Sequence, residues 1–379
     1  MEFSLTEDQL AIKDLSAQVL ADLSTDERLK SLAEKGEVYD KDLWQQFAES
    51  GLLGMAVPES YGGSGFGLVE ICLMLEEQGR YVAALPLLPS LALAGLTLAE
   101  YGSEEQKTQY LTALATGESI LTAALAEEGL SNPHKTVLSA EKNGDHYVLN
   151  GTRVCVPYAK ESAVVLVPAT QEEGRTLIFL VTPEAEGVEL EFQESTNGEP
   201  LYTMTLSNVS LSQANVLVGA DKGEEAYKFM VDRGNVCLAA TQVGIAEEAL
   251  KRTVEYTTDR KQFGKSISQF QGTTLRCADA YIDIEGMRST YWQAVWKLNE
   301  NMPAEAEVRT AKYWACIAGS RVVHTAQHLH GGIGADIDYP LHRYFLWAKR
   351  NELNLGGGSL QLAKLGARLA DKESVVNVL

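Results

Sequence analysis

Residues 259–271 read Asp259-Arg260-Lys261-Gln262-Phe263-Gly264-Lys265-Ser266-Ile267-Ser268-Gln269-Phe270-Gln271. The stretch separates two segments whose apolar residues recur at a helical period, so we expect it to connect two helices. Arg260 would end the first helix, Gly264 would let the backbone turn, and Gln271 would open the second helix. An arginine and a glutamine brought together in this way can converge on a pyrophosphate group. The alternative is a plain helix–loop–helix with a surface arginine.

Helical periodicity extends on both sides of this connection. One apolar stripe consists of Val243, Ala246, Leu250 and Val254, and a second consists of Ala280, Ile284, Met287, Tyr291, Ala294 and Leu298. The second stripe alternates steps of four and three residues, which is typical of helix bundles. Residues 220–379 are therefore predicted to form a C-terminal four-helix bundle.

The period changes to two between residues 119 and 219. Runs of β-forming residues occur at 147–149, 163–167, 177–181 and 202–206, and the pairs Asn143-Gly144, Asn150-Gly151 and Asn197-Gly198 are typical of turns. Residues 1–118 are again helical, with an N-cap expected at Thr6 and an ordered loop from Met55 to Gly67. The predicted fold class is α+β multidomain: an N-terminal α-helical domain (1–118), a middle β-sandwich or barrel domain (119–219) and the C-terminal bundle (220–379).

Composition limits the classes of function. The 379 residues are 45% hydrophobic and carry a formal net charge of −20 without long blocks of like charge, which argues against a nucleic-acid partner. The start lacks the pattern of a leader, and no stretch approaches the roughly 20 apolar residues of a membrane span, so we expect a cytoplasmic protein without membrane insertion. The five cysteines lack metal-ligand spacing and are expected to be buried free thiols.

Three separated motifs resemble those of the flavin-dependent acyl-CoA dehydrogenase family. Residues 51–63 (GLLGMAVPESYGG) resemble its GLLG…VPExYGG segment, residues 259–271 resemble its RxQFGxxIxxFQ segment, and residues 328–334 (HLHGGIG) resemble its QxHGGxG turn. The resemblance covers the whole chain and implies FAD as the cofactor. It also implies that the second motif reaches the FAD of a neighbouring subunit.

The resemblance implies a set of cofactor-binding residues. Arg260 and Gln271 would meet the pyrophosphate, Phe263 would pack on the cofactor, and Gln262 belongs to the same segment. In the third motif, Gly331 and Gly332 would let the backbone approach the phosphates closely. His328 stands where the family has a glutamine, and it could equally be a buried core histidine.

The reaction that the resemblance implies is α,β-dehydrogenation of an acyl-CoA thioester, in which a carboxylate removes the α-proton. Leu355 occupies the position of the family's catalytic Glu, and Gly234 occupies the position used by some relatives. Neither side chain can accept a proton, so no catalytic residue is predicted. Asp232 and Glu352 are nearby carboxylates that could substitute for the base, although Asp232 could equally be a helix N-cap or a surface charge.

The middle domain also departs from the family. Residues 126–132 replace a threonine-bearing strand, and Cys155-Val156-Pro157 replace a Trp-Ile-Thr segment that embraces the flavin ring. The chain is therefore similar to the base-lacking subunit of heterotetrameric bacterial dehydrogenases that act on bulky acyl-CoA thioesters, such as steroid side chains. The expected partners are acyl-CoA, a homologous subunit or a second copy, and an electron-transfer acceptor protein. A homotetramer with a displaced base and a flavin-free binding scaffold remain alternatives.

Overall fold

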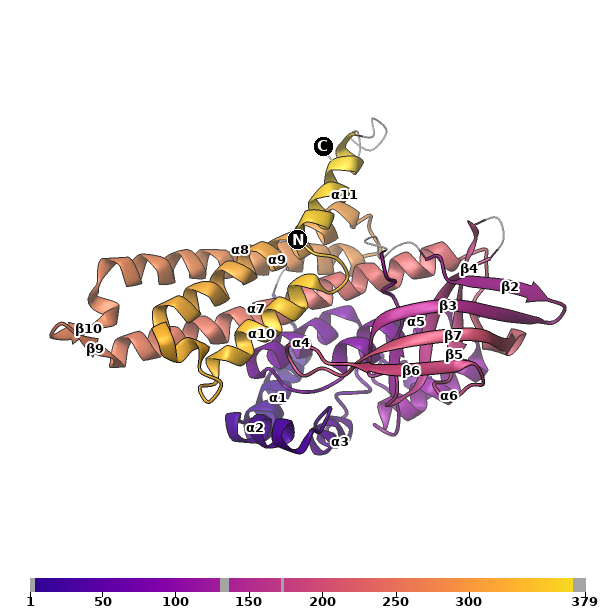
Figure 1. Ribbon diagram of the computed structural model, residues 1–379, viewed down its shortest axis with the longest axis horizontal. Coiled ribbons are helices and arrows are strands. Elements are labelled where there is room, and N and C mark those ends of the chain that lie inside the picture. Colours follow the sequence, from indigo (N-terminus) through magenta and orange to yellow (C-terminus); the bar gives the residue numbers. More distant parts are fainter. Residues whose placement is uncertain (1–3, 130–135, 172–173, 371–379) are drawn as a thin grey trace. The chain divides into compact units, whose positions relative to one another are not determined.

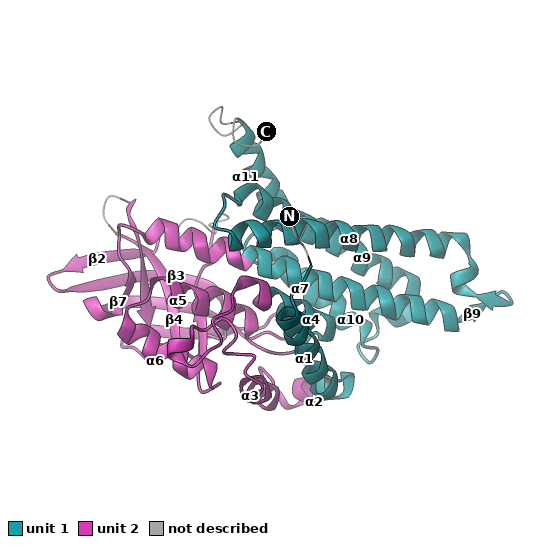
Figure 2. Cartoon of the chain, turned by 180° about the vertical axis from the view of Figure 1, so that it is seen from behind, with its two compact units in different colours: residues 1–30, 72–83, 235–379 teal, residues 31–71, 84–234 magenta. Residues whose placement is uncertain are grey.

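The computed structural model describes residues 4–129, 136–171 and 174–370. The chain forms two compact units (Figure 2). Unit 1 contains residues 1–30, 72–83 and 235–379, and unit 2 contains residues 31–71 and 84–234. The finer division into residues 1–118, 119–219 and 220–379 stays a prediction.

Unit 1 is built from long helices (Figure 1). They are α1 (Glu7–Leu23), α8 (Gln271–Asn299), α9 (Glu305–His330), α10 (Leu341–Leu353) and α11 (Gly358–Ala370), together with most of α4 (Leu68–Tyr81) and α7 (Gly223–Asp259). The expected N-cap of the first helix is confirmed. The Thr6 hydroxyl accepts a hydrogen bond from the Gln9 amide at 3.2 Å, and the Gln9 side chain accepts one from the Thr6 amide at 3.0 Å.

Two glycines allow α4 and α7 to pack with their backbones almost in contact. A Cβ at Gly79 would lie 2.2 Å from the Thr241 carbonyl oxygen, and one at Gly244 would lie 1.8 Å from the Glu76 carbonyl oxygen. Such distances exclude any side chain at either position. The predicted stripe of α8 is buried from Ala280 to Ala294, which confirms that this helix packs in a bundle.

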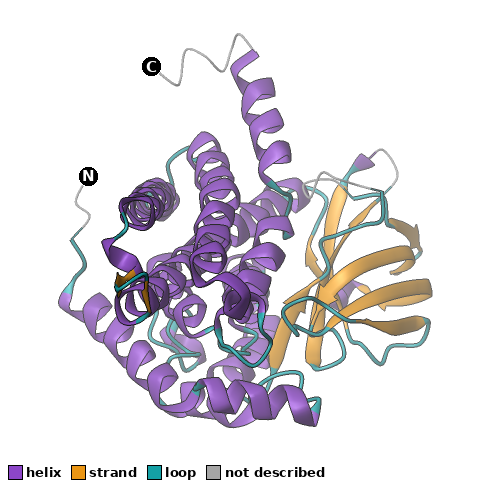
Figure 3. Ribbon diagram, turned by 60° about the vertical axis from the view of Figure 1, so that its left-hand side comes forward, coloured by secondary structure: helices purple, strands orange, loops and turns teal. Residues whose placement is uncertain are grey.

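Unit 2 contains one mixed sheet (Figure 3). Its strands are β1 (Ile120–Ala123), β2 (Ser139–Asn143), β3 (His146–Pro157), β4 (Ser162–Thr170), β5 (Thr176–Val181), β6 (Val188–Gln193), β7 (Leu201–Ser212) and β8 (Val216–Val218). They follow the order β6-β7-β3-β2-β4-β5-β8, with β1 parallel to β4. Among the described strands, β6 and β8 do not pair with each other, so the sheet is not a closed barrel.

The four predicted strands lie within β3, β4, β5 and β7, and residues of these strands share one hydrophobic core. The helical elements of unit 2 are α3 (Lys41–Glu49), η2 (Leu88–Gly95), α5 (Leu96–Tyr101) and α6 (Glu104–Ala115), and α2 (Asp26–Lys35) contributes to both units. The predicted α+β architecture of helices, then strands, then helices is confirmed.

One of the three predicted turns is wrong. Asn150-Gly151 lies inside β3, where the pairing with β7 shifts register, and Gly151 has φ 142°. The Asn150 side chain accepts a hydrogen bond from the Asn208 amide at 2.8 Å, so the pair forms a bulge rather than a chain reversal. Asn143-Gly144 does join β2 to β3.

The loop from Met55 to Gly67 is ordered, as predicted. It contains a single short 3₁₀ turn, η1 (Glu59–Tyr61), and folds back on itself around Gly63. A Cβ at Gly63 would lie 2.0 Å from the Val57 carbonyl oxygen, so this position requires glycine. Across the described ranges of the chain, no helix combines the length and the apolar character that a membrane span requires.

Candidate functional site

Arg260 directly follows α7 and begins a small hairpin of β9 (Lys261–Gln262) and β10 (Lys265–Ser266). Phe263 and Gly264 form its two-residue turn with φ of 54° and 81°, and such a turn needs left-handed backbone at both positions. The Phe263 side chain is 92% exposed and meets the Phe270 ring edge-on with centroids 6.4 Å apart. The hairpin therefore presents an apolar ring to its surroundings.

Three helix ends meet near this hairpin. Because α7, α8 and α9 follow one another through short connections, the end of α7, the start of α8 at Gln271 and the end of α9 at His330 lie at the same end of unit 1. The Tyr256 ring of α7 stacks on the His330 ring of α9, with centroids 4.4 Å apart and an interplanar angle of 19°. The last turns of α7, which lead into the second motif, are therefore in direct contact with the third motif.

The turn after α9 is formed by η6 (Gly331–Ala335). Gly331 has φ 67°, a left-handed conformation that glycine adopts without strain. A Cβ built on Gly331 or Gly332 would meet no atom within 4 Å, so the backbone here is open to an approaching group. This openness agrees with the expected role of both glycines.

Two grooves of unit 1 contain different members of the predicted set. His328 and Gly331 line a groove of 1220 Å³ between α8 and α9, together with Arg276, Asp283 and Arg321. We call this the α8–α9 groove. Arg260 lines a separate groove of 610 Å³, which also contains Arg252, Tyr256 and Tyr339. Gln262, Phe263 and Gln271 are exposed and belong to neither groove.

The alternative role considered for His328, that of a core histidine, is wrong. His328 is exposed, whereas His330, two residues later, is 4% exposed. Burial lowers the pKa of His330, and its Nδ1 lies 2.8 Å from the Ala326 carbonyl oxygen, so the neutral ring donates from Nδ1. His330, which was not among the predicted site residues, is thus the structural histidine of the motif.

Leu355, the position at which the resemblance places a catalytic Glu, lies in a turn between α10 and α11. Leu355 is half-buried and adopts φ 54°, which is unusual for a leucine. The buried Gln361 side chain donates to the Leu355 and Gly356 carbonyl oxygens at 3.3 and 3.0 Å, and its oxygen accepts from Arg309 at 3.1 Å. These bonds fix the turn although it carries no carboxylate.

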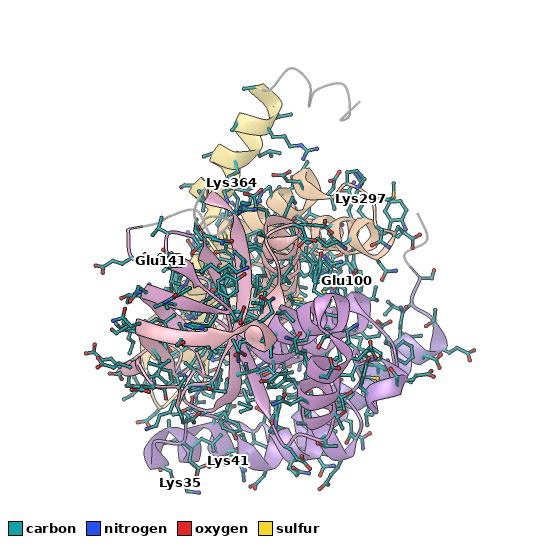
Figure 4. All side chains as sticks on the ribbon, turned by 90° about the vertical axis from the view of Figure 1, so that its right-hand side faces the viewer. Lys35, Lys41, Glu100, Glu141, Lys297 and Lys364 are labelled. Carbon is teal, nitrogen blue, oxygen red and sulfur yellow. The ribbon has the colours of Figure 1, made fainter. Side chains whose placement is uncertain are left out.

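A buried lysine fixes the end of α10. Surface lysines such as Lys35 and Lys41 point away from the protein (Figure 4), but Lys312 is fully buried and burial lowers its pKa. Its Nζ donates to the Asn351 carbonyl oxygen at 2.6 Å and is 3.4 Å from that of Glu352. A cation beside the last carbonyls of a helix stabilises that helix end.

The glycines of this turn provide close packing. A Cβ at Gly356 would lie 2.5 Å from a methyl group of Leu360, and one at Gly358 would lie 3.2 Å from Ile317. Gly356 also has φ 94°. The glycines therefore allow a tight turn, and they do not open a wider pocket.

Both alternative carboxylates are already ion-paired. Asp232 is buried in the middle of α7 and contacts Lys228 one turn away, so it is neither a helix N-cap nor a surface charge. Glu352 lies 3.0 Å from the Lys349 ammonium group. Each carboxylate would have to leave its lysine before it could act as a base.

In unit 2, Cys155 and Pro157 occupy the positions expected to face a flavin ring. Cys155 is exposed with φ 53°, and its amide donates to the Gln193 side chain at 3.0 Å. It corrects the expectation that all five thiols are buried; Cys277 is half-buried, and Cys72, Cys237 and Cys316 are buried. The Pro157 carbonyl oxygen accepts from Thr122 at 2.7 Å.

The segment that replaces the threonine-bearing strand lies only partly in the structure, since residues 130–132 fall outside the described ranges. Its described part is tied to β3 by a buried ion pair between Glu127 and Arg153, which is 0% exposed. The Thr136 hydroxyl donates to Glu127 at 2.6 Å. Glu127 is therefore a structural carboxylate.

Comparisons with known proteins agree with the motifs. The model for the N-terminal domain of acyl-CoA dehydrogenases matches residues 6–118, and the model for the C-terminal domain matches residues 221–370. The chain belongs to the acyl-CoA dehydrogenase family. It is 35% identical to acyl-CoA dehydrogenase FadE27 of Mycobacterium tuberculosis, over 98% of this chain and 99% of that protein.

Solved acyl-CoA dehydrogenases share the fold. The chain is similar to the Tcur3481–Tcur3483 steroid acyl-CoA dehydrogenase in a G363A variant, with 39% identity, a TM-score of 0.90, and coverage of 97% of this chain and 99% of that one. The ChsE4–ChsE5 complex of Mycobacterium tuberculosis gives 35% identity and a TM-score of 0.91, over 98% of this chain and 100% of that one. Family membership confirms the predicted class, an oxidoreductase acting on a CH–CH bond, and the predicted cofactor, FAD.

The end of unit 1 near the hairpin suits the nucleotide half of FAD. Arg260 and Arg276 form no ion pair with any described residue, so both guanidinium groups are available to phosphate oxygens. Arg321, by contrast, is bound to Asp283 at 2.8 Å. In unit 2, the residues expected to face the flavin ring cannot contact it as the Trp-Ile-Thr segment of the family does. Cys155 has no aromatic face, and Pro157 has no hydroxyl group.

The motifs did not reveal Tyr256, His330 and Arg276. Tyr256 lies four residues before Arg260 and thus on the same face of α7, and His330 immediately precedes Gly331. These spacings were visible in the sequence. Arg276 gave no comparable signal, because only the packing of α8 against α9 places it near His328.

Proposed function

We propose that this chain is the subunit without a catalytic base in an α2β2, FAD-dependent acyl-CoA dehydrogenase. Its partner would be a homologous chain that carries the catalytic Glu, and the complex would pass electrons to an electron-transfer protein in the cytoplasm. The observation that carries the proposal is a contrast within unit 1. Arg260 has no ion-pair partner in the described chain, whereas the base position is occupied by Leu355 in a turn fixed by Gln361.

In this proposal, the chain's residues bind and orient the cofactor. The Arg260 guanidinium and the Gln271 carboxamide would donate hydrogen bonds to pyrophosphate oxygens, and Phe263 would cover the nucleotide from water. The open backbone at Gly331 and Gly332 would allow the phosphates to approach. When bound, FAD accepts the hydride that leaves the acyl β-carbon.

The α-proton must go to the partner. A leucine has no lone pair to accept it, and both Asp232 and Glu352 are held by lysines. A general base must lie within about 3 Å of the proton that it removes. The partner's Glu would therefore act at a site to which this chain contributes cofactor contacts.

The substrate class rests on the relatives. One similar structure is described as a steroid acyl-CoA dehydrogenase, and it resembles this chain over nearly its whole length. We propose a bulky acyl-CoA, such as a thioester of a steroid side chain. The close packing around Gly356 and Gly358 leaves no room for a bulky acyl group at this turn. The space that the acyl group needs must therefore come from elsewhere in the complex.

The experiment is an activity test of three preparations: this chain alone, its partner alone, and both co-expressed. The partner is chosen as a homologous chain with Glu at the position of Leu355 or Gly234. Each preparation is assayed by dye reduction with a steroid acyl-CoA and with butyryl-CoA. We expect turnover only in the co-expressed complex and with preference for the steroid thioester. Turnover by this chain alone would refute the proposal and indicate a homotetramer with its own base.

A further inference from the structure

The ring contact between Tyr256 and His330 joins the two segments that carry the cofactor-binding residues. His330 is the last residue of α9 and directly precedes Gly331. It is buried between Tyr256, whose centroid is 4.4 Å away, and Tyr339, whose centroid is 5.4 Å away. The Tyr256 hydroxyl also lies 3.4 Å from the His330 carbonyl oxygen.

The backbone connects each ring directly to a cofactor-binding residue. Tyr256 lies one helical turn before Arg260, and the Arg260 amide donates to the Tyr256 carbonyl oxygen at 2.8 Å. On the other side, the amide of Gly331 donates to the His328 carbonyl oxygen, which closes the end of α9 around His330. A shift of either ring would therefore move Arg260 relative to the Gly331–Gly332 backbone.

Few contacts hold the His330 ring in its orientation. Its Nδ1 bonds the Ala326 carbonyl oxygen at 2.8 Å, and no described protein group bonds its Nε2. The rings of Tyr256 and Tyr339 on its two sides thus limit the remaining rotation of the ring. Arg260 and the glycine turn follow different helices, and the described residues include no ion pair of Arg260 that would fix it from another direction.

We propose that His330 and Tyr256 are positioning residues for FAD: their stacked rings hold Arg260 and the Gly331–Gly332 turn in the register that lets both contact one pyrophosphate. This inference rests on the proposed function, in which this chain supplies the nucleotide contacts. Neither residue touches the reacting atoms. Loss of the stack would weaken cofactor binding, because two groups that must meet the same anion would no longer be held at a fixed separation.

The test uses the co-expressed complex and measures the FAD dissociation constant by flavin fluorescence, the visible circular dichroism of bound flavin, and the melting temperature of the complex. His330→Ala removes the ring, and His330→Phe keeps a stacking ring without the Nδ1 bond. We expect His330→Ala to weaken FAD binding by about tenfold. This factor corresponds to losing the full interaction energy of a strong aromatic pair. His330→Phe should recover binding to within about threefold and restore the circular dichroism.

A matched pair of tyrosine variants separates positioning from stability. Tyr256→Leu removes the ring that stacks on His330, and Tyr344→Leu removes a buried ring elsewhere in unit 1, whose hydroxyl donates to the Arg80 carbonyl oxygen at 3.0 Å. Both should lower the melting temperature, but only Tyr256→Leu should weaken FAD binding. Equal effects of the two variants on FAD affinity would show that His330 and Tyr256 merely stabilise the fold.

Arg260→Ala distinguishes failure of this inference from failure of the proposed function. If Arg260→Ala releases FAD and His330→Ala changes the dissociation constant less than about twofold, the positioning role is refuted while the proposed function stands. If Arg260→Ala also leaves FAD binding unchanged, this chain does not supply the nucleotide contacts and both fail. Weaker binding in His330→Ala, with recovery in His330→Phe, supports the positioning role.

Discussion

Two regions of unit 1 are both built on turns with left-handed backbone but differ in what they offer to a ligand. Around Arg260, the hairpin and the glycine turn present a free guanidinium group, an exposed phenyl ring and open backbone. Around Leu355, the turn is held by Gln361 and Lys312 yet presents a leucine in place of a carboxylate. The turn at Leu355 is thus well held but offers no group that could accept a proton, whereas the end of unit 1 near Arg260 offers groups that could bind an anion.

The largest expected effect tests the first region. Arg260→Ala should remove most of the flavin from the co-expressed complex, because a charge-assisted contact to the pyrophosphate is lost; we expect binding at least about tenfold weaker. The ratio of flavin to protein absorbance measures it. Lys251→Ala is the control, since Lys251 lies on the same helix and pairs with Glu248 at 3.5 Å. If Lys251→Ala also lost flavin, the cause would be the removal of a positive charge from this region rather than the loss of a specific contact made by Arg260.

The second effect tests the other region. Gln361→Leu should lower the free energy of unfolding by about 1–3 kcal/mol, because two partly buried carbonyl groups lose their donor. Urea denaturation of the isolated chain measures this change. Leu362→Ala, at a position on the same helix that is 52% exposed, should have little effect. The flavin content of the complex should stay unchanged in Gln361→Leu. A loss of flavin in this variant would contradict the difference in FAD binding that we expect between the Leu355 turn and the region around Arg260.

Sequence patterns predicted most of the fold for a physical reason. Helical and strand periods reflect which face of an element is buried, so the α8 stripe and the four β runs could be recognised locally. The hairpin at residues 261–266 was recognised only as a connection, since its two-residue turn places Phe263, rather than an asparagine or glycine, in the left-handed conformation.

The errors share a cause, which is that distant segments determine the outcome. Asn150-Gly151 has turn chemistry but bonds Asn208 across the sheet and becomes a bulge. Asp232 was considered as a helix N-cap, but α7 already begins at Gly223. Whether His328 or His330 is buried depends on the packing of α9 against Tyr256, which no local pattern encodes.

A smaller effect concerns pH. Burial lowers the pKa of His330, so the unfolded chain binds a proton more readily than the folded chain. The stability contributed by the neutral ring is complete above the unfolded pKa of about 6.5 and is lost as pH falls below it. Urea titrations from pH 7.5 to about 5.5 should therefore show His330→Phe losing less stability than the unmodified chain. Parallel losses in both proteins would assign the acid sensitivity to other groups.

The smallest expected effect concerns the two remaining carboxylates. Asp232→Asn and Glu352→Gln should leave the turnover number of the complex within about twofold, because both groups are bound to lysines and the partner supplies the base. Substituting the partner's Glu by Gln is the positive control and should abolish turnover. A loss of about a hundredfold or more in either Asp232→Asn or Glu352→Gln would identify that residue as a base and place catalysis in this chain.

The most direct test of the central claim is the flavin content per chain. The chain alone and the co-expressed complex are compared by visible absorbance and native mass spectrometry. We expect the isolated chain to hold no flavin and the complex to be an α2β2 tetramer with flavin only at its unlike interfaces. One flavin in every copy of the isolated chain, with oxidation of an acyl-CoA, would contradict it.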